Sequence, residues 1–188
     1  MATTNQKDID EAVLALQNGQ VIAYPTESVY GLGCDPKQPK AIEKVIHLKQ
    51  RQPDKGLILI ASNFEQLKPY IADIDDEIIA RARATWPGPV TWVWPINESS
   101  TIYSLLHGRF KSVAVRVSAH PVVVQLCNSF GGAIVSTSAN RQGKEPARTA
   151  EKVRQYFSTG IAKIINADVG NLSKPTEIYD LITQAKIR

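Results

Sequence analysis

The stretch Gln20-Val-Ile-Ala-Tyr-Pro-Thr-Glu-Ser-Val-Tyr-Gly-Leu-Gly33 decides how the chain begins to fold. Its first five residues form an apolar run of strand length, and Pro25 ends that strand because proline cannot donate to the ladder of a central sheet. A loop rich in hydroxyl groups is predicted to follow. Because ligands of open α/β sheets bind where strands end, Thr26 and its neighbours are candidates for a ligand site. A plain turn would use the same residue types.

Helical and strand patterns lie on both sides of this stretch without a strict repeat. Helices are predicted over residues 8–17, 39–50, 63–67, 75–84, 121–130 and 149–157, and further strands over residues 57–61, 90–94, 112–118, 133–135, 163–165 and 177–181. No long linker or internal repeat interrupts them. We therefore predict an α/β fold in which residues 1–188 form a single domain on a twisted, mixed β-sheet with packed helices.

The composition fits a globular protein and excludes several other classes. Apolar residues make up 43% and charged residues 21% of the 188 residues, which argues against disorder and against a disulfide-rich scaffold. The longest apolar runs are far shorter than the roughly 18 residues that span a bilayer, and the first residues lack a signal-peptide pattern. Cys34 and Cys127 form no CxxC pair, which suits a reducing compartment. We expect a cytoplasmic protein without membrane contact.

The positive charge of the chain is concentrated in one stretch. Between residues 37 and 55, six basic residues stand against two acidic ones, and this excess of four equals the net charge of +4 of the whole chain. Such a stretch attracts the phosphates of a nucleotide or of a nucleic acid. Lys49 and Arg51 stand where a predicted helix ends, and Lys55 extends the stretch, which favours a polyphosphate site. A solvated helix face explains the earlier lysines of that helix equally well.

Several common catalytic motifs are missing. The sequence contains no GxxxxGK[ST] phosphate loop, no GxGxxG, no HExxH and no GxSxG. Its three histidines are scattered, so the pattern predicts neither a metal site nor a histidine-based triad. The common nucleotide-binding and hydrolase motifs are therefore excluded.

A second polar cluster follows a short apolar strand near residue 135. Ser136, Thr137, Ser138 and Asn140 place four hydrogen-bonding side chains within five residues, and such groups can hold the phosphates, ribose or base of a nucleotide. The turn Trp86-Pro-Gly-Pro-Val-Thr91 is consistent with a structural corner or with a ligand contact.

Arg116 is unusual because the other residues of its predicted strand are apolar or small. A buried, unpaired guanidinium is costly, so Arg116 either meets a carboxylate or faces an anionic ligand. The sequence leaves both alternatives open.

Five motifs, in this order, resemble those of the YrdC-like family, and of its short bacterial members in particular. They are Tyr24–Gly33, Lys49-Gln-Arg51, Trp86–Thr91, Val113–Pro121 and Ser136-Thr-Ser-Ala-Asn140. Together they extend over nearly the whole chain. The resemblance implies a YrdC-like fold and a nucleotidyltransferase that joins L-threonine, bicarbonate and ATP into threonylcarbamoyl-AMP, with release of pyrophosphate, for the modification of tRNA.

The resemblance also implies roles for single residues. As catalytic residues it implies Lys49 and Arg51; as substrate-binding residues Thr26, Ser136 and Thr176; and as nucleotide-binding residues Lys55, Thr91, Arg116, Ser138 and Asn140. Mg²⁺ would be held mainly by the phosphates of ATP, so no metal ligands are expected in the protein. Lys55 stands where many longer relatives carry asparagine, so one phosphate contact is expected to differ.

Two other functions fit parts of the sequence. A module for double-stranded RNA would use the basic stretch to grip phosphates during RNA or ribosome maturation, although the chain lacks a motif of interleaved aromatic and basic residues. A regulator that binds ATP without turnover would keep the cations and would not need Thr26. Under the resemblance, the expected partners are the three substrates, downstream tRNA-modification proteins and RNA contacted through the basic cleft.

Overall fold

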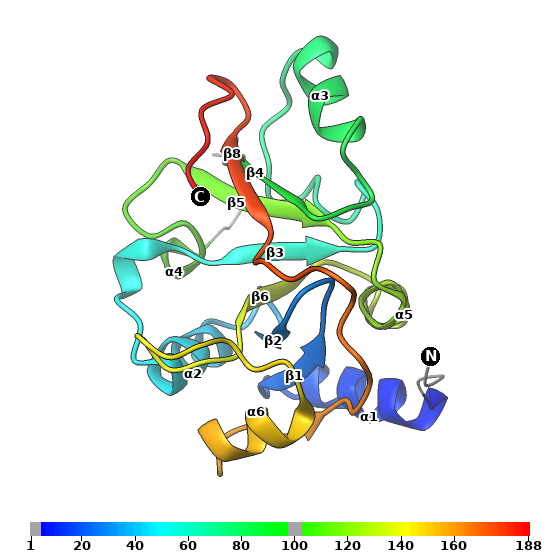
Figure 1. Ribbon diagram of the computed structural model, residues 1–188. Coiled ribbons are helices and arrows are strands. Elements are labelled where there is room, and N and C mark those ends of the chain that lie inside the picture. The colour runs from blue at the N-terminus through cyan, green and yellow to red at the C-terminus, as the bar shows by residue number, and fades with distance from the viewer. Residues whose placement is uncertain (1–4, 98–102) are drawn as a thin grey trace.

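The structure, a computed structural model, describes residues 5–97 and 103–188, which form one mixed sheet with helices packed around it (Figure 1). The strands are β1 Ile22–Pro25, β2 Tyr30–Gly33, β3 Ile58–Ala61, β4 Val90–Pro95, β5 Ser112–Val117, β6 Ile134–Ser138, β7 Lys163–Ile164 and β8 Glu177–Asp180. The helices are α1 Gln6–Gln17, α2 Pro39–Lys49, α3 Asp76–Arg83, α4 Ser104–His107, α5 Pro121–Phe130 and α6 Ala150–Tyr156, with a 3₁₀ turn, η1, at Pro53–Lys55.

The sheet has eight strands in the order β7-β1-β2-β6-β3-β5-β4-β8. The pairs β1–β2, β2–β6, β3–β6 and β4–β5 are antiparallel, whereas β1–β7, β3–β5 and β4–β8 are parallel. The predicted α/β fold on a mixed sheet is thus confirmed.

The local predictions differ from the structure in three places. Residues 30–33, predicted as part of a loop, form β2 and pair with β1 and β6. Residues 63–67, predicted as a short helix, form turns in which the Asn63 side chain accepts a hydrogen bond from the amide of Gln66 at 3.1 Å. The side chain of Gln66 in turn accepts a bond from the amide of Ser62, so local side-chain bonds replace helical ones. The short helix α4 was not predicted.

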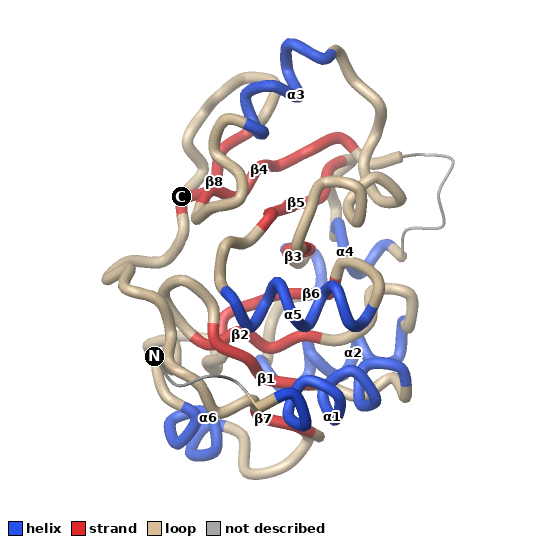
Figure 2. Tube along the Cα trace, turned by 90° about the vertical axis from the view of Figure 1, so that its right-hand side faces the viewer, coloured by secondary structure: helices blue, strands red, loops and turns tan. Residues whose placement is uncertain are grey.

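Two helices cover only one half of a sheet face. α1 and α5 run side by side (Figure 2) and bury Ile60 of β3 and Ile134 of β6 in one apolar cluster. Because side chains two residues apart point to the same face of a strand, Ile58 and Ser136 share that face. They lie beyond the helices and line a cavity instead.

The larger apolar cluster occupies the opposite face. Leu59 and Val135, the neighbours of the residues above, belong to it together with Val45 of α2. Val45 is buried because the apolar positions of α2 recur at helical spacing, and Pro39 at its first turn fits the start of the helix. Arg51, two residues beyond the end of α2, lines the cavity.

Gly33 is required by the packing of Tyr24 and not by a ligand. A Cβ on Gly33 would lie 2.6 Å from the carbonyl oxygen of Val135 and 2.7 Å from Cε1 of Tyr24. The Tyr24 hydroxyl donates to the same carbonyl at 3.1 Å, and burial raises the pKa of this tyrosine well above its ordinary value. Gly31, by contrast, lines the cavity.

This packing makes a prediction about stability. Replacing Gly33 by alanine should lower the free energy of unfolding by about 1–3 kcal/mol, because the added methyl group overpacks a site closed by backbone. Gly132→Ala is the matched control, since a Cβ there would meet only the Phe130 ring at 4.0 Å. Urea unfolding of both variants measures the difference, and equal stability of the two would contradict this account of Gly33.

Candidate active site

The uncovered half of the sheet face forms the floor of a cavity of about 620 Å³, a volume ordinary for small-molecule sites. Of the ten residues predicted for the site, seven line this cavity: Thr26, Arg51, Lys55, Arg116, Ser136, Ser138 and Thr176. They come from β5, β6 and the loops around them. The structure thus brings together residues from both ends of the chain.

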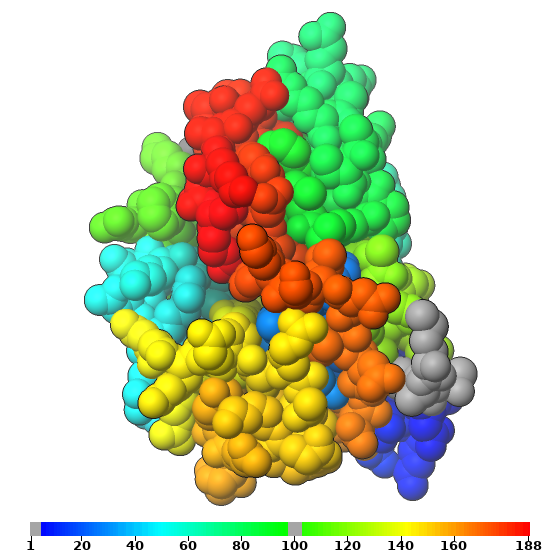
Figure 3. Space-filling view, in the orientation of Figure 1, coloured from blue at the N-terminus to red at the C-terminus, as the bar shows by residue number. Residues whose placement is uncertain are grey.

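One loop connects two sides of the cavity. We call residues 166–176 the strap; in Figure 3 this segment, in orange, crosses the front of the molecule. The amide of Gly170 donates to the carbonyl oxygen of Thr26 at 2.9 Å, and that of Leu172 to the carbonyl oxygen of Glu27 at 3.1 Å. A Cβ on Gly170 would lie 2.6 Å from that Glu27 oxygen, so glycine permits the close approach. The strap then supplies Thr176 to the cavity.

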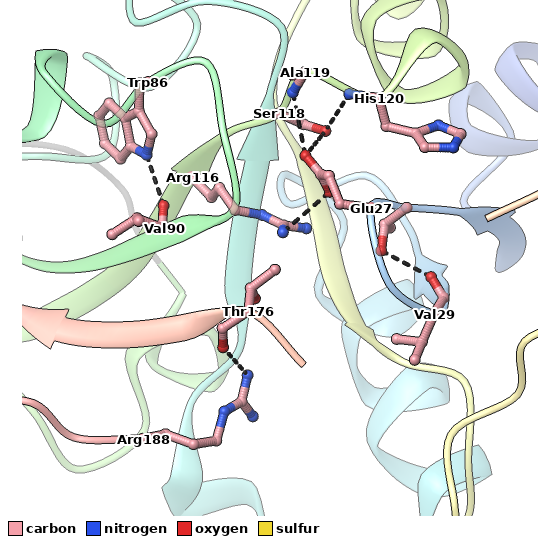
Figure 4. A network of polar contacts seen from close by, with 11 residues as sticks. Glu27, Val29, Trp86, Val90, Arg116, Ser118, Ala119, His120, Thr176 and Arg188 are labelled. Atoms are coloured by element: carbon pink, nitrogen blue, oxygen red, sulfur yellow. Dashed lines mark hydrogen bonds and ion pairs between the residues drawn. The ribbon is translucent and has the colours of Figure 1, made fainter. Parts of the chain in front are cut away.

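Arg116 meets a carboxylate, which resolves one of the alternatives left by the sequence. Its Nη1 lies 3.1 Å from Oε2 of Glu27, and the two side chains point toward one another in Figure 4. The other carboxylate oxygen, Oε1, accepts hydrogen bonds from the Ser118 hydroxyl at 2.7 Å and from the amide of Ala119 at 3.2 Å. Both partners are almost fully buried. Removing one of them would leave a buried charge unpaired, which typically costs about 3–5 kcal/mol.

Arg116 also lines the cavity, so it can pair with the Glu27 carboxylate and bind a ligand at the same time. Its Nε atom is buried and has no hydrogen-bond partner in the part of the chain that the structure describes. A buried polar group without a partner is rare in folded proteins. The Arg116 guanidinium therefore retains the capacity to bind an anionic or polar ligand group.

Three arginines follow one another along the cavity. Burial lowers the pKa of Arg51, and the nearby Arg188 lowers it further; burial likewise lowers the pKa of Arg188, with a further contribution from Arg116. Arg51 donates to the carbonyl oxygen of Gly56 through Nε at 3.2 Å and through Nη2 at 2.9 Å, and Arg188 donates to the carbonyl oxygen of Thr176 at 3.3 Å (Figure 4). Converging cations of this kind favour an anionic ligand.

Lys49 is turned away from the cavity. Its ammonium group donates to the carbonyl oxygen of Ser138 and, at 3.0 and 3.2 Å, to the backbone and side-chain oxygens of Asn140. Burial lowers the pKa of Lys49 to about 8, and the charge of Arg51 contributes in the same direction. Lys49 therefore holds the turn after β6 in place and does not itself line the cavity.

The turn held by Lys49 presents Ser138 to the cavity. The Ser138 hydroxyl donates to Oδ1 of Asn140 at 2.6 Å, and Nδ2 of Asn140 donates to the carbonyl oxygen of Lys144 at 2.7 Å. Asn140 thus uses its amide inside the turn. Neither Lys49 nor Asn140 lines the cavity, so the predicted contacts of Lys49 with the phosphates and of Asn140 with the nucleotide stay predictions.

Thr91 does not reach the cavity. It lies in β4 opposite Ile178 of β8, its side chain is fully buried, and its hydroxyl has no hydrogen-bond partner among the described residues. Its position gives no support to a direct nucleotide contact. The preceding turn is a structural corner, because the Trp86 indole donates to the carbonyl oxygen of Val90 at 2.7 Å and stacks on Trp94.

The hydroxyl residues of the cavity differ in their local bonding. Thr26 is 4% exposed, and its hydroxyl donates to the carbonyl oxygen of Val29 at 2.8 Å, which fixes the side chain after β1. Ser136 lies on β6 between Ile134 and Ser138, at the boundary between helix-covered and open sheet. These positions suit recognition of a small polar ligand, because neutral donors and acceptors surround it.

Sequence reasoning missed two functional candidates, Glu27 and Arg188. Glu27 stands inside a quoted motif, and its carboxylate could have been proposed as the partner of Arg116. No pattern in the sequence around Arg188 indicates a site. Arg188 reaches the cavity because residues 186–188 fold back on β8, where the amide of Ile178 donates to the carbonyl oxygen of Arg188 at 3.0 Å.

The described residues contain no group of three or more histidine, cysteine, aspartate or glutamate side chains that could hold a metal ion. Within the same residues, no helix is long and apolar enough to cross a membrane.

Comparison with known proteins gives concordant matches. Residues 14–188 match the model of the Sua5/YciO/YrdC family, which carries the description "Telomere recombination". The threonylcarbamoyl-AMP synthase of Photobacterium profundum is 47% identical over 183 residues, which cover 96% of this chain and 98% of that protein. The threonylcarbamoyl-AMP synthase of Serratia proteamaculans is 51% identical over 176 residues, with 93% and 92% covered.

Solved structures agree with these matches. The crystal structure of P. abyssi Sua5 complexed with L-threonine superposes with a TM-score of 0.87 at 31% identity; the match covers 94% of this chain and 51% of that chain. This chain thus spans about half the length of that protein. E. coli YciO superposes with a TM-score of 0.85 at 26% identity, and the match covers 98% of this chain and 89% of that chain.

The surroundings of Lys49 predict its titration. We expect its Nζ group to lose its proton with a midpoint at about pH 8, because burial penalises the charged form. Arg51→Gln should raise this midpoint, since the variant removes a nearby positive charge. NMR of lysine-labelled protein measures both values, and an unchanged or lower midpoint in the variant would contradict the electrostatic contribution of Arg51.

Proposed function

This chain belongs to the Sua5/YciO/YrdC family, and from that premise and the geometry of the cavity we propose that it is a threonylcarbamoyl-AMP synthase. In this reaction L-threonine, bicarbonate and ATP give threonylcarbamoyl-AMP, pyrophosphate and water. The enzyme is then a nucleotidyltransferase, since it transfers the adenylyl group of ATP to a carbamate oxygen.

The row Arg51–Arg188–Arg116 is the observation that carries this proposal. Three cations in one cavity, bordered by neutral hydroxyl groups, match a ligand set that combines a triphosphate with a small carboxylate. Arg51 and Arg188, together with Lys55, take the phosphates. Arg116 lies beside the segment that carries Thr26 and Glu27, so it takes the carboxylate of threonine.

The chemistry follows from this placement. The amine of threonine combines with bicarbonate to give a carbamate and water; a carbamate oxygen then attacks the α-phosphorus, and the bond to pyrophosphate breaks. The protein supplies position and positive charge, and the step needs no nucleophilic side chain. Arg51 and Lys55 stabilise the charge that grows on the leaving pyrophosphate. Thr26, Ser136 and Thr176 orient the amino acid.

Lys49 and Asn140 act indirectly in this scheme. Their bonds to one another and to Ser138 hold the Ser138 hydroxyl at the cavity wall, where it contacts the nucleotide. We propose that Mg²⁺ accompanies the nucleotide substrate and is bound mainly through its phosphates.

We further propose that the product serves the modification of tRNA, through transfer of the threonylcarbamoyl group by other proteins. The mixed anhydride of a carbamate and a phosphate is reactive, so a protein that consumes it has to receive it quickly. Contact with RNA through the basic rim of the cavity, near Arg51 and Lys55, is part of this proposal.

The first test is pyrophosphate release by the purified protein. We expect release from ATP only when threonine and bicarbonate are both present, because the carbamate is the attacking group. Omission of either substrate is the control. Release that does not depend on threonine, or no release from folded protein, would contradict the proposed synthase.

Two variants test whether threonine and the phosphates of ATP bind at different ends of the cavity. Thr26→Val keeps the shape of the side chain and removes the hydroxyl, so the KM for threonine should rise by about tenfold or more while the KM for ATP changes little. Arg51→Gln should do the reverse, because it removes a charge from the phosphate end. Steady-state kinetics with each substrate varied in turn measures both. Equal effects on the two KM values in either variant would contradict the assignment.

A further inference from the structure

Glu27 has a position that the reaction itself does not explain. It carries a negative charge, is 9% exposed, and lies beside a cavity whose proposed substrates are all anionic or zwitterionic. A free carboxylate there would repel the carboxylate of threonine and the phosphates of ATP. Its oxygens are engaged, however, by Arg116 on one side and by Ser118 and Ala119 on the other.

The bonds to Oε1 fix the carboxylate independently of Arg116. Ser118 donates its hydroxyl to Glu27 and accepts a bond from the amide of His120 at 3.1 Å, at the start of α5. On the other side, the strap binds the backbone of Glu27 through Leu172. Glu27 is thus anchored at both its backbone and its side chain before it meets the guanidinium.

An arginine side chain has several rotatable bonds, and a bound ligand would have to order it if nothing else did. The ion pair between Oε2 and Nη1 holds Arg116 beside Glu27, while neither Nη1 nor Nε of Arg116 has a hydrogen-bond partner among the described residues, so both remain available to a ligand. Preorganisation of this kind increases affinity because the ordering cost is met during folding.

From this geometry we infer that Glu27 is a positioning residue, which holds the Arg116 guanidinium ready for the carboxylate of the amino-acid substrate. The inference rests on the proposed function, because it takes Arg116 as the receptor of that carboxylate. It predicts a selective effect: loss of the Glu27 charge weakens threonine binding and leaves the nucleotide end of the cavity intact.

The test is Glu27→Gln, which keeps the size of the side chain and removes its charge. The KM for threonine should rise by about tenfold or more, while the KM for ATP should change by less than about twofold. Glu151→Gln is the matched control: Glu151 pairs with Arg154 at 3.4 Å on the exposed surface of α6, so both KM values should stay unchanged. A parallel rise of both KM values in Glu27→Gln, or an unchanged threonine KM, would overturn the inference.

A double-mutant cycle tests whether Glu27 acts through Arg116. In an Arg116→Ala background, Glu27→Gln should no longer raise the threonine KM, because no guanidinium remains to be positioned and the substitution removes an unpaired carboxylate that repels the substrate. A rise as large as in the wild-type background would overturn the inference, since Glu27 would then act by another route.

A second variant and a second measurement cover the remaining cases. If Glu27→Gln does not fold, Ser118→Ala removes one bond to Oε1 and should raise the threonine KM selectively; no selective rise would overturn the inference.

Calorimetric titration with L-threonine measures binding without turnover. If the wild type binds threonine but releases no pyrophosphate, the proposed function fails while weaker binding by Glu27→Gln still supports the role of Glu27, and equal binding would overturn it.

Discussion

The site depends on one constraint: α1 and α5 are long enough to cover only half of one sheet face. Along β6 the change is visible in alternate residues, because Ile134 lies beneath the helices and Ser136 and Ser138 line the cavity. The same strand therefore serves the core at one end and a polar ligand at the other, and its sequence changes from apolar to hydroxyl residues where the helices end.

Cations at such a half-buried site need hydrogen-bond or ion-pair partners, and the protein supplies these partners in different ways. Lys49 is satisfied by three oxygen atoms of the turn after β6, and Arg51 by carbonyl oxygens of the turn at η1. Arg116, the most buried of the cavity cations, has a carboxylate partner. Neutral oxygen acceptors hold Lys49 and Arg51 in place without cancelling their charge. The end of the cavity that we propose to bind the phosphates of ATP therefore keeps its positive charge. Where Glu27 neutralises a charge, the ligand expected is a single carboxylate and not a triphosphate.

Much of this could be predicted from the sequence, for identifiable reasons. The alternation of valines over Ser112–Val117 is a local pattern that placed β5 correctly, whereas the strand predicted over residues 133–135 was too short, because β6 extends to Ser138 and includes the hydroxyl residues. β2 was missed because Pro25 indicated a loop, whereas the chain turns back after Pro25 and Tyr30–Gly33 pairs with β1 and β6. The direction of Lys49 and the arrival of Arg188 depend on contacts between segments far apart in sequence, and no local pattern encodes them.

The strap links the two halves of the amino-acid end of the cavity. Its amides hold the carbonyl oxygens of Thr26 and Glu27, and a few residues later it contributes Thr176, whose carbonyl oxygen accepts a bond from Arg188. A shift of the strap would therefore move Thr26, the Glu27–Arg116 pair and Arg188 together. His120 adds a further attachment, since its Nε2 lies 3.2 Å from the carbonyl oxygen of Asp168, and burial lowers the pKa of this histidine. This end of the cavity thus depends on one loop that is fixed from both sides, so the arrangement that we propose to bind threonine is built into the fold and does not have to form around the ligand.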